Sequence, residues 1–587
     1  MRRWLVVAVV LLLRAPFLNQ AIQGDDVYYL AGAEHAQIDP AHPLNFRYVF
    51  LGDRVDMEGN THPPLNAWVL GLLLAAAGDI REVPFHAAYI VFSLIAALSM
   101  WSLAKRFSPH PLWATLLFMA TPAFVINGTS LEADLPFLAF WMAGAALFAA
   151  GRYASAAGAL ALASMAAYQA AVLTPILAVY AWLFARRSKA AWAAVLVPPA
   201  VIAGWQLFEL ATIGKLPMAV MIGHFQTYRF QSAANKLRNA AALPVHACWL
   251  VFPALLPPAF LASRKRRDPE TIFLAAWIAI FFAAGMGIFF AGSARYLLPM
   301  AAPAVLLVSR LNPRLLAAGF AAQLTLSLSL AAVNYQHWNA YRSMVEALKP
   351  QLAGKRVWIN TEWGLRYYLE AEGGLPVLRE QSVRPGDLVV SSSLGFPVPI
   401  AAAGAAFAPI VEREIRPALP LRLIALNTRS AYSTVDRGFY PFDISAGPID
   451  RVRVETVVER GPELEFLSMT SREADPQLAG GVYALEGDHR WMAGRAVILL
   501  KSPGKATPVR VEIYIPETAP ARRLTVLLDD AEIASRTFPG PGRYSIDTPP
   551  RRPAKPTAIL TLTVDRTFTV PADRRELGVV ILQAGFK

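Results

Sequence analysis

The first 340 residues consist mainly of apolar runs that are separated by short clusters of basic residues. The whole chain is 55% hydrophobic and only 17% charged, although a soluble chain of 587 residues needs more charge to cover its surface. A membrane-spanning helix requires roughly 20 consecutive apolar residues. The pattern therefore predicts a polytopic α-helical membrane region.

We expect about eleven spans. Their approximate bounds are 4–20, 84–104, 111–128, 135–150, 153–167, 168–185, 190–211, 241–262, 271–290, 296–310 and 314–333. Arg2 and Arg3 precede the first apolar stretch, which could also be a signal peptide. No small-x-small cleavage site follows it, so we favour an uncleaved first span.

Basic clusters set the expected orientation, because cytoplasmic loops carry an excess of Lys and Arg. The clusters are Arg2/Arg3, Lys105/Arg106, Arg152, Arg186/Arg187/Lys189, Arg264 to Arg267 and Arg310/Arg314. If these lie inside, the outward connections are 21–83, 129–134, the turn near Tyr168, 212–240, 292–295 and the tail. The short apolar stretch 63–79 would reverse this orientation if it spanned. We expect instead a helix that lies at the outer interface or dips back into the membrane.

The tail changes character twice. Residues 356–360 and 387–391 read as strands around a helix at 362–372, which predicts an α/β module over 341–445. Strict alternation at 509–515 and 560–564 predicts an antiparallel β-sandwich over 446–587. The sandwich could bind carbohydrate, dock an acceptor or cap the molecule. Trp491 could stack on a sugar, although a buried core tryptophan is the more common case.

Charge and cysteine content exclude several classes of protein. The basic residues behind the net charge of +13 are dispersed in short clusters between apolar runs. The sequence has no basic stripe interleaved with aromatic residues, so we do not expect nucleic-acid binding. The single cysteine, Cys248, excludes a disulfide framework and a thiolate metal site. Few ionisable residues fall inside the predicted spans, whereas a transporter places such groups near the bilayer midplane.

Unusual polar residues gather instead in the outward connections. They are Asp25, Asp26, Glu34, His35, Asp39, His42, Asp53, Asp56, Glu58 and His62 in the first, Glu132 and Asp134 in the second, and Arg295 with Tyr296 before span ten. Carboxylates and a cation that converge on one membrane face indicate an active site.

Five short motifs occur in a characteristic order. They are Arg14-Ala15-Pro16, Gly24 to Tyr29 (GDDVYY), His62 to Leu65 (HPPL), Asp134 to Phe137 (DLPF) and Arg295 to Pro299 (RYLLP). The set resembles glycosyltransferase family 39 of the GT-C superfamily, which includes protein O-mannosyltransferases and lipid A aminoarabinose transferases. The segment Trp363 to Tyr368 (WGLRYY) is similar to the periplasmic segment of bacterial relatives. The chain departs from the family at Tyr168 and Gln169, where many relatives carry a lysine.

The resemblance implies a multi-pass protein of the bacterial inner membrane with a periplasmic tail. It would transfer a sugar from a polyprenyl-phosphate donor to an acceptor hydroxyl on the periplasmic side, with inversion. Lipid, glycan and protein acceptors remain open, as does the sugar, a hexose or a pentose. The alternative is a non-catalytic, membrane-anchored protein that binds or exports glycan.

Residue roles follow from the resemblance and from the chemistry. Asp25 matches the catalytic base, Asp26 its acidic neighbour and Tyr29 the aromatic. A carboxylate at the membrane surface can accept the acceptor's proton, and a second one raises the pKa of at least one of the pair. We expect Asp26 or Asp134 to orient the substrate; a solvated acidic turn is the ordinary alternative.

The remaining candidates would bind substrate. The planar fork of Arg295 suits the departing phosphate, although an arginine that only snorkels to the interface is the alternative. His62, Glu132 and Tyr296 complete the set, with a turn histidine and an interface-belt tyrosine as the ordinary alternatives. No nucleotide-binding glycine loop and no Asp-x-Asp pair occurs, so we expect no cofactor and leave a divalent cation at Asp25 and Asp26 open.

Overall fold

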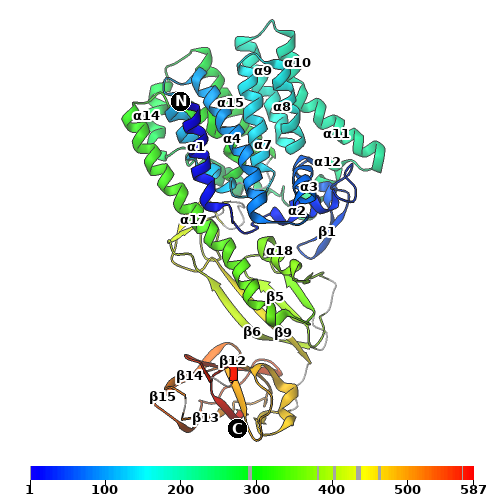
Figure 1. Ribbon diagram of the computed structural model, residues 1–587, viewed down its shortest axis with the longest axis vertical. Helices are drawn as coiled ribbons and strands as arrows, with labels where there is room; N and C mark the ends of the chain where they lie inside the picture. Colours follow the sequence, from blue (N-terminus) through cyan, green and yellow to red (C-terminus); the bar gives the residue numbers. More distant parts are fainter. Residues whose placement is uncertain are drawn as a thin grey trace.

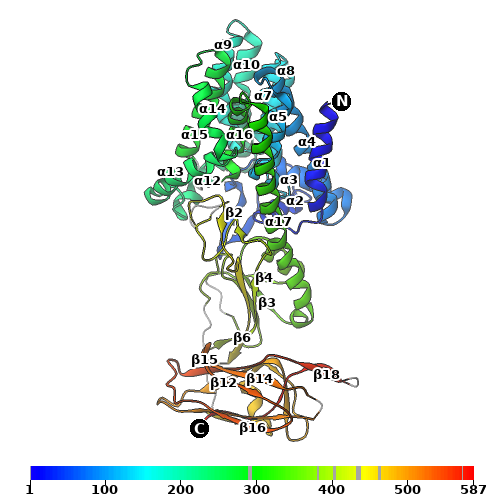
Figure 2. The same ribbon diagram turned by 90° about the vertical axis from the view of Figure 1, so that its left-hand side faces the viewer.

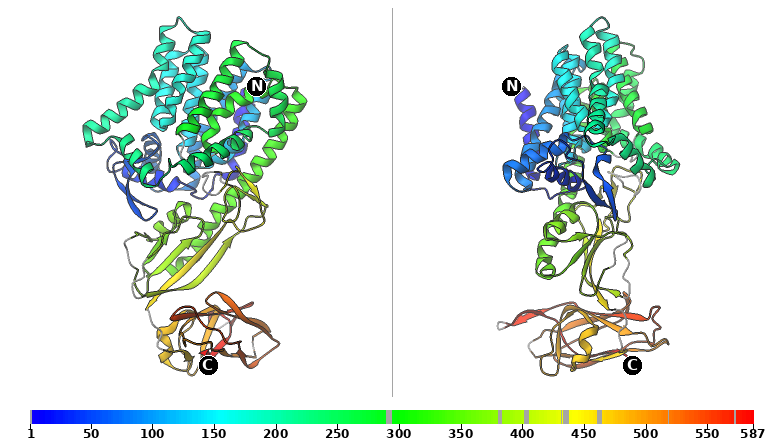
Figure 3. Two further views of the ribbon diagram at one scale, coloured as in Figure 1. Left: turned by 180° about the vertical axis from the view of Figure 1, so that it is seen from behind. Right: turned by 90° about the vertical axis from the view of Figure 1, so that its right-hand side faces the viewer.

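The computed structural model describes residues 2–288, 294–379, 383–400, 405–430, 432, 438–459, 464–517, 519–570 and 573–587. Its long axis runs through three parts in succession, a helical bundle, an α/β module and a β-sandwich (Figure 1). The sandwich lies at the end far from the bundle in the other views as well (Figure 3).

The bundle contains a helix in every range predicted to span. Its helices are α1 (Arg2–Arg14), α4 (Glu82–Phe107), α5 (Pro111–Met119), α6 (Pro122–Asn127), α7 (Asp134–Ala149), α8 (Tyr153–Ala166), η3 (Tyr168–Val172), α9 (Leu173–Phe184), α10 (Lys189–Val195), α11 (Val197–Ile213), α13 (Ala233–Cys248), η4 (Pro253–Leu255), α14 (Leu256–Ser263), α15 (Pro269–Ile288), η5 (Arg295–Leu297), α16 (Leu298–Val308) and α17 (Pro313–Leu352). Several begin at proline, whose missing N–H costs nothing in the first turn.

Three of these helices, α4, α15 and α17, are long and apolar enough to cross a membrane among the described residues. The number rises to five if each bent pair is one span, namely α10 with α11 (43°) and α13 with 253–263 (78°). The predicted spans 190–211 and 241–262 are therefore bent, and the predicted span 111–128 consists of the two helices α5 and α6. Proline at Pro122 and Pro253 explains the breaks within 111–128 and 241–262, because it cannot donate the helical hydrogen bond. The total of eleven spans stays a prediction.

The outward connections gather at one end of the bundle. The elements α2 (Asp26–His35), β1 (Arg47–Phe50), β2 (Asp53–Asp56), η2 (Met57–Gly59), α3 (Leu65–Ala77) and α12 (Pro217–Thr227) belong to them. They face the tail, whereas the N-terminus and the α9–α10 connection lie toward the opposite end (Figures 1 and 2). Helix α3 has 13 residues, or about 20 Å, and is too short for a roughly 30 Å hydrocarbon core.

Helix α17 joins the bundle to the α/β module. Its 40 residues extend about 60 Å, and its C-terminal half packs with α18 (Trp363–Ala371) on a five-stranded sheet. The strand order is β4-β3-β5-β9-β6. The strands are β3 (Val357–Asn360), β4 (Leu375–Pro376), β5 (Leu388–Ser392), β6 (Ala405–Ile415) and β9 (Asp450–Glu459). Because β9 pairs with both β5 and β6, the module extends past the boundary predicted at 445.

The last part is an antiparallel β domain, as the alternation predicts. Its strands are β10 (Phe466–Ser468), β11 (Leu478–Val482), β12 (Arg490–Lys501), β13 (Val509–Ile515), β14 (Arg522–Leu528), β15 (Ala531–Phe538), β16 (Gly542–Asp547), β17 (Thr557–Val564) and β20 (Val580–Phe586). Their main order is β15-β14-β17-β12-β20-β13-β16. Val509, Val511 and Ile513 all point into its core. Trp491 is partly buried, with its ring edge-on to Phe568 at 5.9 Å.

Candidate active site

Arg295 is the centre of a cluster of carboxylates where the bundle meets the tail. Its side chain is buried, and Nη2 lies 2.9 Å from Asp25 Oδ2. Nη1 contacts Glu132 Oε2 and lies 3.8 Å from Asp134 Oδ2. Nη2 also donates to the Tyr296 hydroxyl at 3.2 Å. Burial lowers the pKa of Arg295, but the carboxylates, Glu132 foremost, raise it well above its usual value, so the guanidinium stays charged.

A tight turn presents Asp25 to this cluster. Gly24 adopts φ +45°, and a Cβ at that position would lie 2.8 Å from Glu132 Oε1. The positive φ therefore favours glycine at this position, and Glu132 approaches it closely. The Asp25 amide donates to the same Glu132 oxygen at 3.1 Å. As a result the Asp25 side chain, 35% exposed, stays within reach of both solvent and Arg295.

Asp26 takes a different direction from its neighbour. It is fully buried at the start of α2 and accepts hydrogen bonds from the Gln23 amide (3.1 Å), the Ser130 hydroxyl (2.9 Å) and the Leu131 amide (2.8 Å). Burial raises the pKa of its carboxyl to about 7. Asp26 thus joins the first and second outward connections, and its side chain lies outside the cavity described below.

Asp134 begins α7 and is also buried. A carboxylate in the first helical turn interacts favourably with the helix dipole. It belongs to the charged cluster through Arg295 but, like Asp26, does not line the cavity.

His62 and Tyr29 stand side by side at the cavity, with ring centroids 5.7 Å apart. His62 Nδ1 lies 3.1 Å from the Ala166 carbonyl oxygen. Burial lowers the pKa of His62, so the ring is neutral near pH 7. Since a carbonyl only accepts, Nδ1 carries the hydrogen and Nε2 remains an acceptor.

A cavity of about 330 Å³ collects these groups at the junction of bundle and module. Of the predicted residues, Asp25, Tyr29, His62, Glu132, Arg295 and Tyr296 line it. The opposite wall was not foreseen from the sequence. It carries Trp338 of α17, Glu362 and Trp363 at the start of α18, and Phe396 after β5. Trp363 belongs to the segment Trp363 to Tyr368 that resembles bacterial relatives, but the sequence alone did not show that it lies in the same cavity as Asp25.

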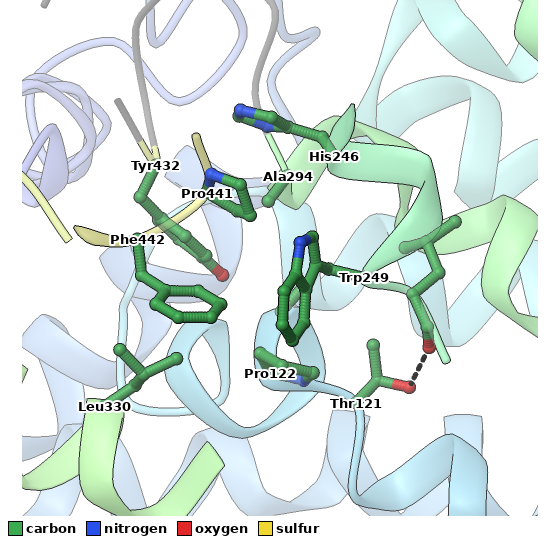
Figure 4. A pocket seen from close by; sticks show the side chains of 11 residues that line it. Thr121, Pro122, His246, Trp249, Ala294, Leu330, Tyr432, Pro441 and Phe442 are labelled. Atoms are coloured by element: carbon green, nitrogen blue, oxygen red, sulfur yellow. Dashed lines mark hydrogen bonds between the residues drawn. The ribbon is translucent and has the colours of Figure 1, made fainter. Parts of the chain in front are cut away.

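Tyr432 and Phe442 of the α/β module lie beside Ala294 and Trp249 of the bundle (Figure 4), and Ala294 immediately precedes Arg295. The Tyr432 carbonyl accepts a hydrogen bond from the Ala294 amide at 3.2 Å, and its hydroxyl donates to Asn127 Oδ1 at 2.9 Å. Phe442 lies edge-on to Trp249 of the bundle at 4.7 Å. The tail therefore holds the backbone at Ala294, the residue before Arg295, and contacts the bundle beside it.

The described residues contain no group of three or more His, Cys, Asp or Glu side chains placed to hold a metal ion. The carboxylates of Asp25 and Asp26 point to different surroundings, one to the cavity and one to buried amides.

Fold and site together describe a helical protein with candidate membrane spans and a charged cavity where the helical bundle meets the α/β module. No family model matches the chain, and no curated protein matches it.

Among solved structures, the chain is similar to ArnT from Cupriavidus metallidurans in the apo state, with 13% identity and a TM-score of 0.42 over 66% of this chain and 92% of that one. The same protein bound to undecaprenyl phosphate has 14% sequence identity and a TM-score of 0.40, again over 66% of this chain and 92% of that one. Arabinofuranosyltransferase AftD from mycobacteria has 13% sequence identity and a TM-score of 0.43, over 100% of this chain and 60% of that one.

Proposed function

We propose that this protein is a membrane glycosyltransferase that moves a sugar from a polyprenyl-phosphate donor to an acceptor hydroxyl. The observation that carries the proposal is the pairing of a cavity-facing carboxylate, Asp25, with a buried guanidinium, Arg295. A base and a phosphate-binding cation are the two groups that such a transfer needs.

In the proposed reaction the acceptor oxygen attacks the anomeric carbon while the bond from that carbon to the phosphate oxygen breaks. The proton of the acceptor passes to Asp25, and the electron pair of the broken bond leaves on the polyprenyl phosphate. Arg295 stabilises that charge through its planar fork. A single displacement of this kind inverts the anomeric centre.

The ion pair between Asp25 and Arg295 suggests an order of events. The phosphate of the sugar donor, when it reaches Arg295 Nη2, competes with Asp25, because both anions accept hydrogen bonds from the same guanidinium nitrogen. Glu132 still holds Nη1 and keeps the guanidinium in place. The incoming phosphate thereby releases Asp25 to act as a base.

The other predicted residues have supporting roles. Neutral His62 offers Nε2 as an acceptor to a sugar hydroxyl, and Tyr29 and Tyr296 bound the donor. Asp134 and Asp26 orient Arg295 and the Asp25 turn rather than touching substrate. The basic clusters favour an orientation with the tail on the side opposite the cytoplasm, and the family resemblance implies that the membrane is the bacterial inner membrane.

The test is turnover by the full-length protein in lipid nanodiscs. Polyprenyl phosphates carrying mannose, glucose, galactose or an aminopentose are supplied one at a time, and release of polyprenyl phosphate is measured. We expect one donor to react and Asp25→Asn to lower the rate by about 10²- to 10⁴-fold.

Asp79→Asn, an exposed change in the same outward connection, is the matched control and should leave the rate unchanged. The proposal fails if no donor reacts or if Asp25→Asn turns over normally. Glycan binding without turnover would favour the non-catalytic alternative.

A further inference from the structure

Two aromatic residues on the module side of the cavity have backbone angles that such residues rarely adopt. Trp363 has φ +70° and Phe396 has φ +55°, and both line the cavity. A positive φ crowds Cβ, so a bulky residue keeps it only where its surroundings enforce it, and such strain clusters at functional sites. The two ring centroids lie 5.2 Å apart at 73°. Together they form a rigid aromatic corner.

The sheet places this corner where α/β proteins bind ligands. Trp363 follows β3 and Phe396 follows β5, and these strands are parallel neighbours. Open α/β sheets bind ligands outside the carboxyl ends of their strands. The two turns are also joined, because the Glu362 amide donates to the Gly395 carbonyl at 2.9 Å. A Cβ on Gly395 would lie 2.1 Å from Thr361 Oγ1, so only glycine permits this approach.

A third ring ties the corner to the loop that carries Asp25. Trp338 of α17 lies edge-on to Trp363 at 6.4 Å. Its Nε1 donates to Asn334 Oδ1 at 2.9 Å, and Asn334 Nδ2 donates to Gln23 Oε1 at 2.6 Å. Gln23 precedes Asp25 by two residues, so the aromatic corner and the proposed base are held by one network.

Polar groups connect the corner to the reacting centre. Tyr28 lies one helical turn after Asp25, and its hydroxyl donates to Glu362 at 2.8 Å. Glu362 immediately precedes Trp363 and lines the cavity as well. The Glu362 carboxylate and the Tyr28 hydroxyl therefore lie between the Trp363 ring and Asp25.

The opposite side of the cavity suits the lipid. Phe225 of α12 borders both the cavity and a neighbouring groove of about 590 Å³, which is lined by the apolar Ile222 and Ile288 and by the polar Gln226, Arg229, Gln231 and Ser232. Ile288 ends α15, one of the helices long enough to cross a membrane. A prenyl chain would therefore lie on that side, which leaves the aromatic corner for the acceptor.

We propose that Trp363, Phe396 and Trp338 form an acceptor subsite that takes a sugar ring, so that the acceptor is a glycan. This inference rests on the function proposed above. The C–H face of a sugar carries partial positive charge and packs on the negative face of an aromatic ring, while its rim of hydroxyls meets Glu362 and Tyr28. An extended peptide is held mainly by hydrogen bonds to a strand edge, whereas this corner offers ring faces.

The first test is binding, measured by saturation-transfer NMR on the full-length protein in nanodiscs. The probes are the methyl glycosides of mannose, glucose, galactose and arabinose, and a Ser/Thr-rich peptide. Trp363→Gly removes the ring while glycine retains access to the positive φ. We expect at least one methyl glycoside to bind and Trp363→Gly to weaken that binding about two- to tenfold, the effect of one aromatic contact.

The second test separates acceptor from donor in turnover. Trp363→Gly should raise the acceptor KM by the same factor and the donor KM by less, with Trp363→Phe closer to wild type. Trp491→Leu, a tryptophan change in the sandwich, is the matched control and should leave both values unchanged.

Several outcomes overturn the subsite. In the binding test these are a wild-type protein that binds none of the methyl glycosides, or a Trp363→Gly variant that binds them normally. In turnover they are a Trp363→Gly variant whose donor KM rises more than its acceptor KM, or transfer of sugar to the peptide but not to the methyl glycosides. If wild type consumes no donor, the proposed function fails separately, and the NMR measurement still decides whether the corner binds sugar.

Discussion

Two buried arginines, one in the bundle and one in the α/β module, are both surrounded by carboxylates. Arg366 of α18 is 1% exposed; it pairs with Glu362 and Glu370 at 2.9 Å each and packs over the Tyr48 ring at 4.2 Å. Arg295 is 8% exposed, and one of its partners, Asp25, faces the cavity. In the first cluster, called the closed cluster, the guanidinium is enclosed by protein, although Glu362 borders the cavity and Glu370 is 28% exposed. In the second, called the open cluster, the Asp25 side chain is 35% exposed and faces the cavity.

The difference distinguishes an arginine that supports the fold from one available for chemistry. Arg366 also donates to the Val49 carbonyl, so it fixes the β1–β2 hairpin against α18. Its two carboxylate partners lie four residues before and four residues after it along the chain. At Arg295 a bound anion can replace Asp25 while Glu132 remains in place. The four predictions that follow change one cluster and compare it with the other.

The largest effect is expected at the closed cluster. Arg366→Met leaves Glu362 and Glu370 without their cation and should lower the free energy of unfolding by about 3–5 kcal/mol. Arg416→Met removes an exposed pair with Glu414 and should change it by less than about 1 kcal/mol. Thermal unfolding of both variants measures the contrast; equal melting temperatures would show that the buried cluster is not a support of the fold.

At the open cluster the expected loss is in turnover. Arg295→Gln should lower kcat by about 10²- to 10³-fold, because the departing phosphate loses its principal donor. The melting temperature should also fall, because Glu132 and Asp134 are only 8% and 9% exposed and lose their cation, whereas the 35% exposed Asp25 side chain can be solvated. Arg295→Lys keeps the charge but not the fork and should retain intermediate activity. A variant that only raises the donor KM would argue against a role in the transition state.

The open cluster was easier to foresee because its residues carry visible signals. Asp25 and Arg295 lie in polar stretches beside long apolar runs. A charged side chain is costly inside the membrane, so charged residues next to predicted spans indicate a functional site. The helical ranges were likewise predictable, since each span has a minimum apolar length. The helix breaks at Pro122 and Pro253 could have been predicted from the prolines themselves, but a prediction of spans from hydropathy alone does not consider them.

Other features could not be foreseen, because they depend on contacts between distant segments. Asp25 and Asp26 look equivalent in sequence, yet the first precedes α2 and faces the cavity while the second is buried under Leu131. Phe396 carries no motif, and only the register of β5 beside β3 brings it next to Trp363. Strand β9 shows alternation like that of the sandwich, but it pairs within the module.

A smaller effect concerns His62, which lies beside the open cluster. Burial lowers its pKa, so below about pH 6.5 the unfolded chain binds a proton that the folded protein does not. The stability contribution is present above pH 6.5 and is lost as pH falls toward the folded pKa, by at most about 1.4 kcal/mol per pH unit. His62→Gln should flatten the decline in melting temperature over this acidic range. An unchanged slope would mean that His62 takes up its proton equally in both states.

The smallest effect is expected where the two clusters meet. Tyr28 follows Asp25 on α2 and donates to Glu362, the partner of Arg366, at 2.8 Å. Tyr28→Phe removes that single hydrogen bond and should cost about 1 kcal/mol of stability, with a severalfold loss of turnover because the two walls of the cavity are no longer joined there. Tyr335→Phe, which removes a solvent-exposed hydrogen bond to Asn19, is the matched control. If Tyr28→Phe behaves like this control, the clusters are independent, and the closed one does not help to position the open one.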